Sequence, residues 1–452
     1  MKGNTDSVNR ITEGVIWKQL LLFFFPIVLG TFFQQLYNTA DTVVVGRFVG
    51  KEALASVGGS TAQIANLVVG FFVGLSSGAT VVISQFYGAK DRQELNRSLH
   101  TAFAFCIAGS IVITIAGIAL APWLLRLMNT PEQLMKDSLI YLRIYFGGIL
   151  FVFIYNMGSS ILRAVGDSKR PLYYLIVCCI LNIVLDLVLV VIFHMGVAGA
   201  AIATVFSQAV SAVLVTAALA RSQDLYQLRF REIRFYKNAL ISLIWIGLPA
   251  GFQSTMYSIS NMVIQTSLNA LGTDTVAAWT AFGKIDSFYW MVNNSFGIAV
   301  TTFVGQNFGA GKYDRMKRSV RVGIGMALVA AVAITGLFFL AGKPIFHLFT
   351  TDSGVITIGM RILRLMAPAY FLFVFIELLS GALRGTGDVM IPMIITCCGV
   401  CILRIIWVLL VVPFRPGLET IIFSYPVTWL ITAVLFIIYY RIREKHFGEV
   451  RR

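Results

Sequence analysis

Charged residues, histidines and nucleotide-binding loops are scarce in this sequence. Asp, Glu, Lys and Arg make up only 13% of the 452 residues, and 58% of the residues are hydrophobic. A soluble protein of this length cannot bury so much apolar surface in its cores, whereas a lipid bilayer can take the place of an interior. The sequence has no Gly-x-x-x-x-Gly-Lys-Ser/Thr loop for ATP phosphates and no His-Glu-x-x-His zinc motif, and its four histidines are scattered. We therefore expect no enzymatic activity and no bound cofactor.

The cysteines and the N-terminus also lack familiar signals. All six cysteines lie inside strongly apolar segments, and the Cys398-x-x-Cys401 pair has neither a second pair nor a histidine partner. They are therefore interpreted as small apolar residues. Residues 1–18 are polar, and no small-residue cleavage site follows the first apolar stretch, so we expect no cleavable signal peptide.

Apolar stretches long enough to cross a bilayer recur along the whole chain. A spanning helix needs about 20 such residues, and several stretches are longer, which predicts tilted or kinked helices. Pro26, Pro249, Pro368 and Pro426 lie inside these stretches and are candidate kinks. The pattern predicts an all-α membrane protein with twelve spans, at residues 16–45, 53–83, 98–125, 137–162, 170–193, 197–220, 239–269, 275–305, 318–341, 357–383, 389–413 and 417–441.

The basic residues indicate the orientation of the chain. Both terminal segments and the alternate loops that would lie on the same side carry 25 of the 36 Lys and Arg residues. Cytoplasmic loops are enriched in Lys and Arg, so both termini are predicted to be cytoplasmic, in a multi-pass protein of the inner membrane. The net charge of +15 is thus a topology signal, and we expect no nucleic-acid partner. The longest polar stretch, 221–237, is either a solvated linker or a segment lying on the membrane surface.

The two halves of the sequence are repeats of each other. Arg163-Ala-Val-Gly-Asp167 recurs 221 residues later as Arg384-Gly-Thr-Gly-Asp388, and Gln85-Phe-Tyr-Gly-Ala89 recurs at the same offset as Gln306-Asn-Phe-Gly-Ala310. We expect an N-terminal six-helix lobe (1–220), a cytoplasmic linker (221–238) and a C-terminal six-helix lobe (239–452). Six spans per lobe give both lobes the same orientation, which makes the repeat parallel. Two such lobes that rock around a central cavity are typical of a transporter.

Ionisable residues inside predicted spans are candidate functional residues because charge is costly there. Asp41 lies in the first span, Asn182 and Asp186 are one turn apart in the fifth, and Thr204 is in the sixth. Helix rise puts Asp41, Asp186 and Thr204 at similar depths, roughly 9–13 Å from the outer helix ends, and Tyr141 at a similar depth. Two acids in an apolar site can bind a proton, or share a sodium ion with the oxygens of Asn182 and Thr204. The alternative is a hydrogen-bond network that only fixes helix packing. The predicted surrounding network is Gln34, Tyr37, Asn38 and Tyr141.

The second half carries its own charges inside spans. Asp286 and Arg404 come out at similar depth, which predicts an ion pair within the lobe, although Lys284 could neutralise Asp286 instead. Glu377 is nearer the cytoplasmic end and is expected to face a cavity. Methionines with aromatic neighbours can form an adaptable wall for large hydrophobic ligands. The further candidate substrate contacts are Asn156, Met157, Met256, Tyr257 and Glu377.

Together these residues resemble those of the multidrug and toxic compound extrusion (MATE) transporters, over about residues 15–440. The resemblance rests on Pro26 and the Gln34–Asp41 segment, the two repeated motifs, the Asn182/Asp186 pair and Gly199–Thr204. It implies secondary antiport, in which an H⁺ or Na⁺ gradient drives the export of cationic lipophilic drugs. Asp41, Asn182, Asp186 and Thr204 match the cation site of the bacterial DinF-like branch. The Glu of the NorM-like branch is missing from Phe252–Tyr257, which favours coupling in the N-terminal lobe.

The resemblance also defines the remaining expectations. Pro26 is expected to allow the first span to bend, and Asp41, Asn182, Asp186 and Thr204 to bind a metal ion only if that ion is Na⁺. We expect a monomer whose partners are cationic small molecules and the lipid bilayer. The alternative function is a flippase for lipid-linked precursors, which shares this broad architecture. A flippase should have a basic cavity to hold a pyrophosphate, whereas the predicted chamber is acidic.

Overall fold

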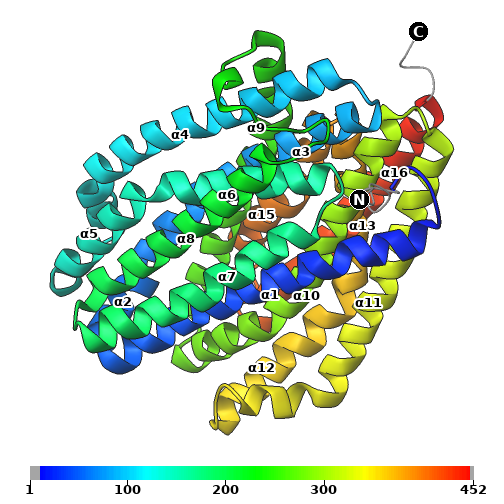
Figure 1. Ribbon diagram of the computed structural model, residues 1–452. Coiled ribbons are helices and arrows are strands. Elements are labelled where there is room, and N and C mark those ends of the chain that lie inside the picture. Colours follow the sequence, from blue (N-terminus) through cyan, green and yellow to red (C-terminus); the bar gives the residue numbers. More distant parts are fainter. Residues whose placement is uncertain (1–10, 448–452) are drawn as a thin grey trace. The chain divides into compact units, whose positions relative to one another are not determined.

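The computed structural model describes residues 11–447, and these residues form helices joined by turns and by one longer linker, residues 221–236, with no β-strand among them. Figure 1 shows the helices in chain order. The first half contains α1 (Ile16–Phe48), α2 (Lys51–Gly58), α3 (Ser60–Gly88), α4 (Arg92–Leu127), α5 (Glu132–Gly147), α6 (Ile149–Ala164), α7 (Lys169–Asp186), the π-helix η2 (Leu187–Ile192) and α8 (Gly196–Ala220). The second half contains α9 (Lys237–Asn269), α10 (Thr273–Gly309), α11 (Tyr313–His347), α12 (Ser353–Met366), the 3₁₀-helix η4 (Ala367–Ala369), α13 (Tyr370–Gly385), α14 (Met390–Thr396), the π-helix η5 (Cys397–Ile402), α15 (Leu403–Leu410) and α16 (Leu418–His446).

Ten helical segments of the described chain are long and apolar enough to cross a membrane, and the bent pair α5 and α6 makes an eleventh. The remaining predicted span corresponds to α10, which is 37 residues long and is not among these segments. The all-α class is confirmed. The two terminal segments used to orient the chain lie partly outside the described residues, at 1–10 and 448–452.

Several predicted spans are interrupted. The second is divided at Gly59 between α2 and α3, and the fourth bends by 48° between α5 and α6. The tenth is interrupted by η4 at Pro368, where proline removes a backbone donor. By contrast, Pro26, Pro249 and Pro426 lie inside α1, α9 and α16, each a single continuous helix.

The repeat is visible in the backbone where α6 and α13 end. Gly166 and Gly387 have φ angles of 96° and 92°, which favour glycine because it has no Cβ. The amide of Asp167 donates to the carbonyl of Leu162 at 2.8 Å, and the amide of Asp388 donates to that of Leu383 at 3.1 Å. The two Gly-Asp motifs therefore end equivalent helices with the same turn.

The described chain forms two compact units. The first unit is Phe25–Gly251, and the second unit is residues 11–24 together with 252–447. Each unit therefore includes the beginning of a helix that continues in the other: α1 starts in the second unit and α9 in the first. Phe24 of α1 stacks on Phe296 of α10 with ring centroids 3.9 Å apart.

The start of α9 packs against α3 through glycines in the first unit. A Cβ added to Gly247 would lie 2.3 Å from the carbonyl oxygen of Leu75, and one added to Gly78 would lie 2.5 Å from that of Leu243. A Cβ added to Gly74 or to Gly251 would lie 2.6 or 2.9 Å from backbone atoms of the facing helix. Small residues spaced by four on both helices allow this approach, as in other membrane proteins. Gly74–Gly78 also matches a Gly-x-Ser-x-Gly pattern, but it lies within a continuous helix and not in the strand-to-helix turn of a hydrolase.

The linker after α8 folds back onto the first unit, close to the start of α4 (Figure 1). The backbone amide of Arg229 donates to Nε2 of His100 at 2.9 Å, and that of Tyr236 donates to Oγ1 of Thr101 at 3.2 Å. Tyr226 and Leu228 are only 3% and 2% exposed. The linker is thus docked on the first unit through these contacts, while Phe230 and Phe235 remain exposed.

Candidate functional site

The four predicted cation-site residues come together in the first unit from α1, α7 and α8. Oγ1 of Thr204 lies 3.1 Å from Oδ2 of Asp41, to which it can donate, and 3.1 Å from the carbonyl of Ala200. Asp41 also interacts at close range with Asp186 and Asn182. All four side chains are buried, and none is more than 8% exposed. The structure therefore forms one compact polar cluster, hereafter the carboxylate site, defined by Asp41, Asn182, Asp186 and Thr204.

Most polar atoms of the carboxylate site lack a hydrogen bond of normal geometry within the described chain. These atoms are Oδ1 of Asp41, both carboxylate oxygens of Asp186 and both amide atoms of Asn182. No ion pair in the described chain involves either acid. Buried polar groups are nearly always satisfied, because an unpaired one costs about 1–3 kcal/mol and an unpaired charge costs more. The described chain therefore supplies no basic partner and few well-formed hydrogen bonds to these two acids.

Tyrosines surround the carboxylate site. Tyr141 of α5 lies near both acids and near Thr204, and its ring is stacked on that of Tyr145 with centroids 6.2 Å apart. Tyr37 of α1, one turn before Asp41, interacts with Asp41 and Tyr141. These two predicted network residues are thus brought to the site. The rings of Tyr37 and Tyr141 exclude water from their side of the carboxylate site, and their hydroxyls can hydrogen-bond a polar ligand.

Gln208 is a member of this network that the sequence analysis missed. It lies one turn after Thr204 on the same face of α8, and its Nε2 approaches the hydroxyl of Tyr37 at 3.5 Å. Its amide oxygen is buried without a hydrogen bond in the described chain. The four-residue spacing from Thr204 was the available signal.

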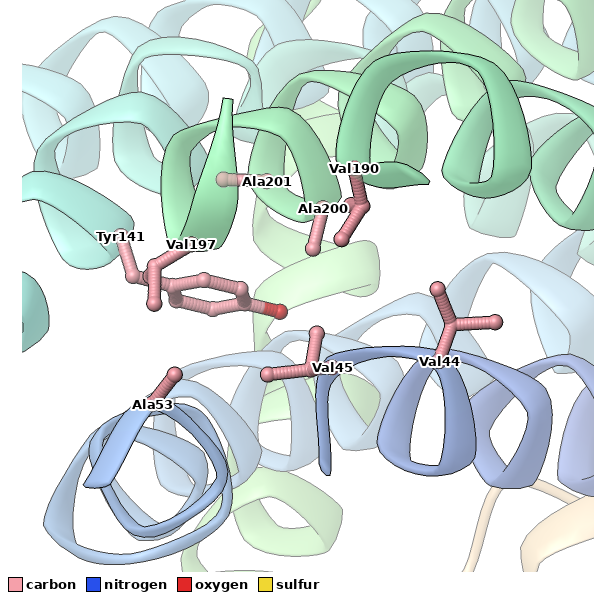
Figure 2. Close-up of a cluster of buried hydrophobic side chains, with 8 residues drawn as sticks. All are labelled: Val44, Val45, Ala53, Tyr141, Val190, Val197, Ala200 and Ala201. Carbon is pink, nitrogen blue, oxygen red and sulfur yellow. The ribbon is translucent and has the colours of Figure 1, made fainter. Parts of the chain in front are cut away.

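An apolar layer lies one helical turn beyond the polar residues. Val45, Val190 and Ala200 are four residues from Asp41, Asp186 and Thr204, on the same helix faces and toward the end of the unit where α1 ends. All three belong to one buried cluster with Val44, Ala53, Tyr141, Val197 and Ala201 (Figure 2). Figure 2 shows the Tyr141 ring between α8 and the α1–α2 region, with its hydroxyl pointing toward the space between Ala200 and Val45. This layer closes the carboxylate site on that side.

Local backbone features bring Asp186 and Thr204 together. The helix changes from α to π immediately after Asp186, and η2 ends at the turn into α8. A Cβ on Gly199 would lie 3.2 Å from the carbonyl of Leu189, so glycine allows α8 to approach η2 closely. π-Helical turns are rare and occur often at functional sites.

The other predicted contacts lie elsewhere. Gln34 and Asn38 are on the exposed side of α1, away from the buried cluster. Met157 is buried in α6, and Asn156 donates to the carbonyl of Val152 at 2.8 Å. Met256 is half-buried in α9. None of these residues is among the hydrogen-bond or charge partners of Asp41 and Asp186 in the described chain.

The second unit has a cavity of about 470 Å³ that contains buried charges. Asp286, Glu377 and Arg404 line it together with Tyr257 and several tryptophans. The predicted Asp286–Arg404 ion pair is not among the ion pairs of the described residues. Asp286 instead accepts hydrogen bonds from Tyr370 and, at 2.6 Å, from Trp290, while the Arg404 guanidinium lies 3.8 Å from the ring centroid of Tyr425.

The remaining charges of the second half are accounted for separately. Glu377 forms an ion pair with Arg384 at 3.6 Å. Lys284 is exposed, and no ion pair joins it to Asp286 in the described chain. No group of three or more His, Cys, Asp or Glu side chains suited to a metal ion occurs within residues 11–447.

Replacing Tyr370 with Phe is expected to destabilise the second unit. The substitution leaves the buried Asp286 carboxylate with one hydrogen bond fewer, which costs about 1–3 kcal/mol. A fall of several degrees in the thermal midpoint of the purified protein would show this. Tyr173→Phe is the control, because Tyr173 is 57% exposed and its loss should leave the midpoint unchanged. Equal midpoints for both variants would contradict the proposed support of Asp286.

Comparison with known proteins agrees with the internal repeat. The MatE family model matches residues 26–188 and again 249–410, which are the two repeats. The chain is 31% identical over 390 residues to the probable multidrug resistance protein YoeA of Bacillus subtilis, covering 84% of each chain. It is 28% identical to the probable multidrug resistance protein NorM of Thermotoga maritima, covering 84% of this chain and 82% of the relative.

Solved structures agree on the fold. An outward-facing multidrug resistance MATE family transporter of the MOP superfamily superposes with a TM-score of 0.91 at 22% identity, covering 97% of this chain and 98% of the other. At that identity the likeness shows the fold alone. The twice-repeated family match and the extensive identity to YoeA decide the assignment. The chain belongs to the MATE family of multi-pass, ion-coupled membrane transporters.

Proposed function

We propose that this protein exports cationic lipophilic compounds in exchange for H⁺ or Na⁺, and that the carboxylate site holds the coupling ion. The observation that carries this proposal is the pair of buried acids, Asp41 and Asp186, close together with no basic partner in the described chain. Two neighbouring carboxylates in an apolar region repel each other if both are ionised. Either one of them is protonated or a cation binds between them.

The donor set suits either ion. A proton shared by the two carboxylates would supply one of the missing hydrogen bonds. A sodium ion would find hard oxygen ligands in Asp41, Asp186 and the amide oxygen of Asn182, with the Thr204 hydroxyl beside them. In both cases the bound ion neutralises negative charge. A neutral site has less attraction for a cationic compound, so ion and substrate compete for the same unit, and this competition couples their movements.

The other predicted residues are assigned to substrate binding and to helix bending. Gln34 and Asn38, on the exposed face of α1, and Tyr257 and Glu377, in the second-unit cavity, are proposed substrate contacts. Asn156, Met157 and Met256 are further proposed substrate contacts. Pro26 interrupts the backbone hydrogen bonds of α1 and would permit that helix to bend roughly 22 Å before Asp41 along its axis.

The same proposal includes the placement of the chain. Both termini would face the cytoplasm in a monomer of the inner membrane, with functional halves at 1–220 and 239–452 joined by the linker 221–238. The charge count of the loops supports this orientation. The division follows the sequence repeat, and the two matches to the family model support it.

Two observations favour an exporter over a flippase for lipid-linked precursors. The relatives named above are multidrug resistance proteins. In addition, the buried charges of the first unit's site are acidic, which suits a cation and repels a pyrophosphate. Bacterial cells that express the protein should accumulate less ethidium than control cells, and removing the driving ion gradient should abolish the difference. Unchanged ethidium accumulation, together with movement of a lipid-linked pyrophosphate in vesicles, would overturn the exporter assignment.

Thr204→Val is expected to reduce ethidium efflux severalfold. The substitution preserves the shape of the side chain but removes the hydroxyl that lies 3.1 Å from the Asp41 carboxylate. Thr204→Ser keeps the hydroxyl and should retain most of the activity. If the Val and Ser variants are equally active, the hydroxyl has no part in the site.

A further inference from the structure

A second hollow lies in the second unit, between the ends of α11, α13 and α16, and we call it the basic groove. It has a volume of about 700 Å³. Four basic side chains line it, and they face a single acid, Glu444, which pairs with Arg321 at 3.1 Å. The excess of positive charge is three. The four basic residues are Lys317, Arg321, Arg441 and Lys445.

The groove is basic at one end and apolar at the other. Helix rise places Lys317 roughly 6 Å from the start of α11 but Ile324 roughly 17 Å from it. On α16, Lys445 is the last residue but one, and Ile437 lies roughly 12 Å further along the helix from it. The apolar lining is completed by Val320, Phe375 and Leu379. An anionic phospholipid has a matching arrangement, because its charged headgroup is followed by apolar acyl chains.

The repeat shows what occupies the equivalent place in the first unit. At the offset of 221, Arg321 corresponds to His100, and Arg441 corresponds to Ala220. In the first unit the linker covers these positions. The amide of Arg229 donates to His100, and Nε2 of Gln227 donates to the carbonyl of Ala220 at 3.2 Å.

The second unit has no such cover in its described residues. After the position equivalent to the end of α8, α16 continues to His446 and does not turn back. Tyr440 lines the groove and is 8% exposed, and its hydroxyl has no hydrogen-bond partner within residues 11–447. The linker therefore covers this place in the first unit. In the second unit, residues 11–447 leave the equivalent place uncovered, with basic side chains and an unpaired Tyr440 hydroxyl.

We propose that the basic groove holds one anionic phospholipid of the surrounding bilayer. Its phosphate lies among Arg321, Arg441 and the two lysines, and an acyl chain follows the apolar wall toward Ile324 and Phe375. The lipid takes the place that the linker occupies in the first unit. It ties together the ends of three helices that residues 11–447 leave uncovered, and so stabilises the second unit.

The test uses the purified full-length protein in a neutral detergent. Phosphatidylglycerol is added, with phosphatidylcholine and inorganic phosphate as separate arms, and the thermal midpoint and retained lipid by native mass spectrometry are measured. The wild type should keep one phosphatidylglycerol and gain thermal stability from it, and neither other addition should do so. In the variant Arg321→Gln/Arg441→Gln the affinity should fall about 25-fold, because each basic residue near an anionic headgroup contributes roughly fivefold.

The matched control is Arg318→Gln/Arg364→Gln. It removes the same charge from exposed positions outside the groove and should bind phosphatidylglycerol like the wild type. Equal binding by both double variants would overturn the proposal and leave the groove to another occupant, residues 448–452 included. A full effect from inorganic phosphate would show a site for free anions, and a full effect from phosphatidylcholine would show lipid binding without charge recognition. Either result contradicts the proposal.

Discussion

Replacing Asp41 with Asn is expected to reduce ion-driven ethidium efflux at least tenfold. Asn resembles Asp in size and can still accept the hydrogen bond from Thr204, so packing at the site should be preserved. The amide cannot bind a proton, and it leaves Asp186 as the only carboxylate available for a cation. Efflux by cells that express equal amounts of each protein would measure the effect.

The control for this experiment is Asp314→Asn, which makes the same change on the exposed surface of α11. That variant should transport like the wild type. Asp186→Asn should behave like Asp41→Asn, because the two acids act as a pair. Full efflux by Asp41→Asn at normal expression would show that Asp41 only contributes to helix packing.

Replacing Gly247 with Ala is expected to have the largest effect on stability. A Cβ at this position would lie 2.3 Å from the backbone oxygen of Leu75, and a backbone atom can only move if the whole helix moves. Such overpacking typically costs about 1–3 kcal/mol. The thermal midpoint of the purified protein should fall by several degrees.

Gly109→Ala is the matched control within the same unit. Gly109 also lies inside a helix, but nothing lies within 4 Å of its added Cβ. There the change should be neutral or stabilising, since Ala favours helix by up to about 1 kcal/mol. If both variants shift the midpoint equally, the glycine contact between α3 and α9 is not important.

Much of the fold was predictable because membrane helices and internal repeats leave strong patterns in sequence. Charge inside an apolar span is costly, so Asp41 and Asp186 stood out without any structure. Their meeting with Thr204 followed from helix rise, which sets depth. Gln208 shared that logic through its spacing from Thr204, but an uncharged amide in an alanine-rich helix gives a weaker signal.

Features that depend on tertiary contacts could not be predicted. Depth alone suggested an Asp286–Arg404 pair. In the structure, Tyr370 and Trp290 donate hydrogen bonds to Asp286, and the Arg404 guanidinium stacks over the ring of Tyr425. Periodicity placed Asn38 and Asp41 on one face, but only Asp41 is buried. A face spans many degrees, and the neighbouring helix covers only part of it.

The assignment of the first residues of α1 to the second unit and of α9 to the first unit also depends on tertiary contacts. The glycine spacing at Gly74–Gly78 and Gly247–Gly251 was readable in the sequence and typical of close helix packing. Nothing in the sequence indicated that these two pairs face each other. The π-helix after Asp186 is likewise a product of packing, since no residue type specifies it.

Transport in proteoliposomes, with pH and Na⁺ gradients imposed separately, is the most direct test of the coupling role assigned to Asp41 and Asp186. For the wild type, one of the two gradients should drive uphill movement of a cationic compound. For Asp41→Asn, neither gradient should drive it, although the reconstituted protein should still bind the compound. Uphill transport by Asp41→Asn at the wild-type rate would contradict the account.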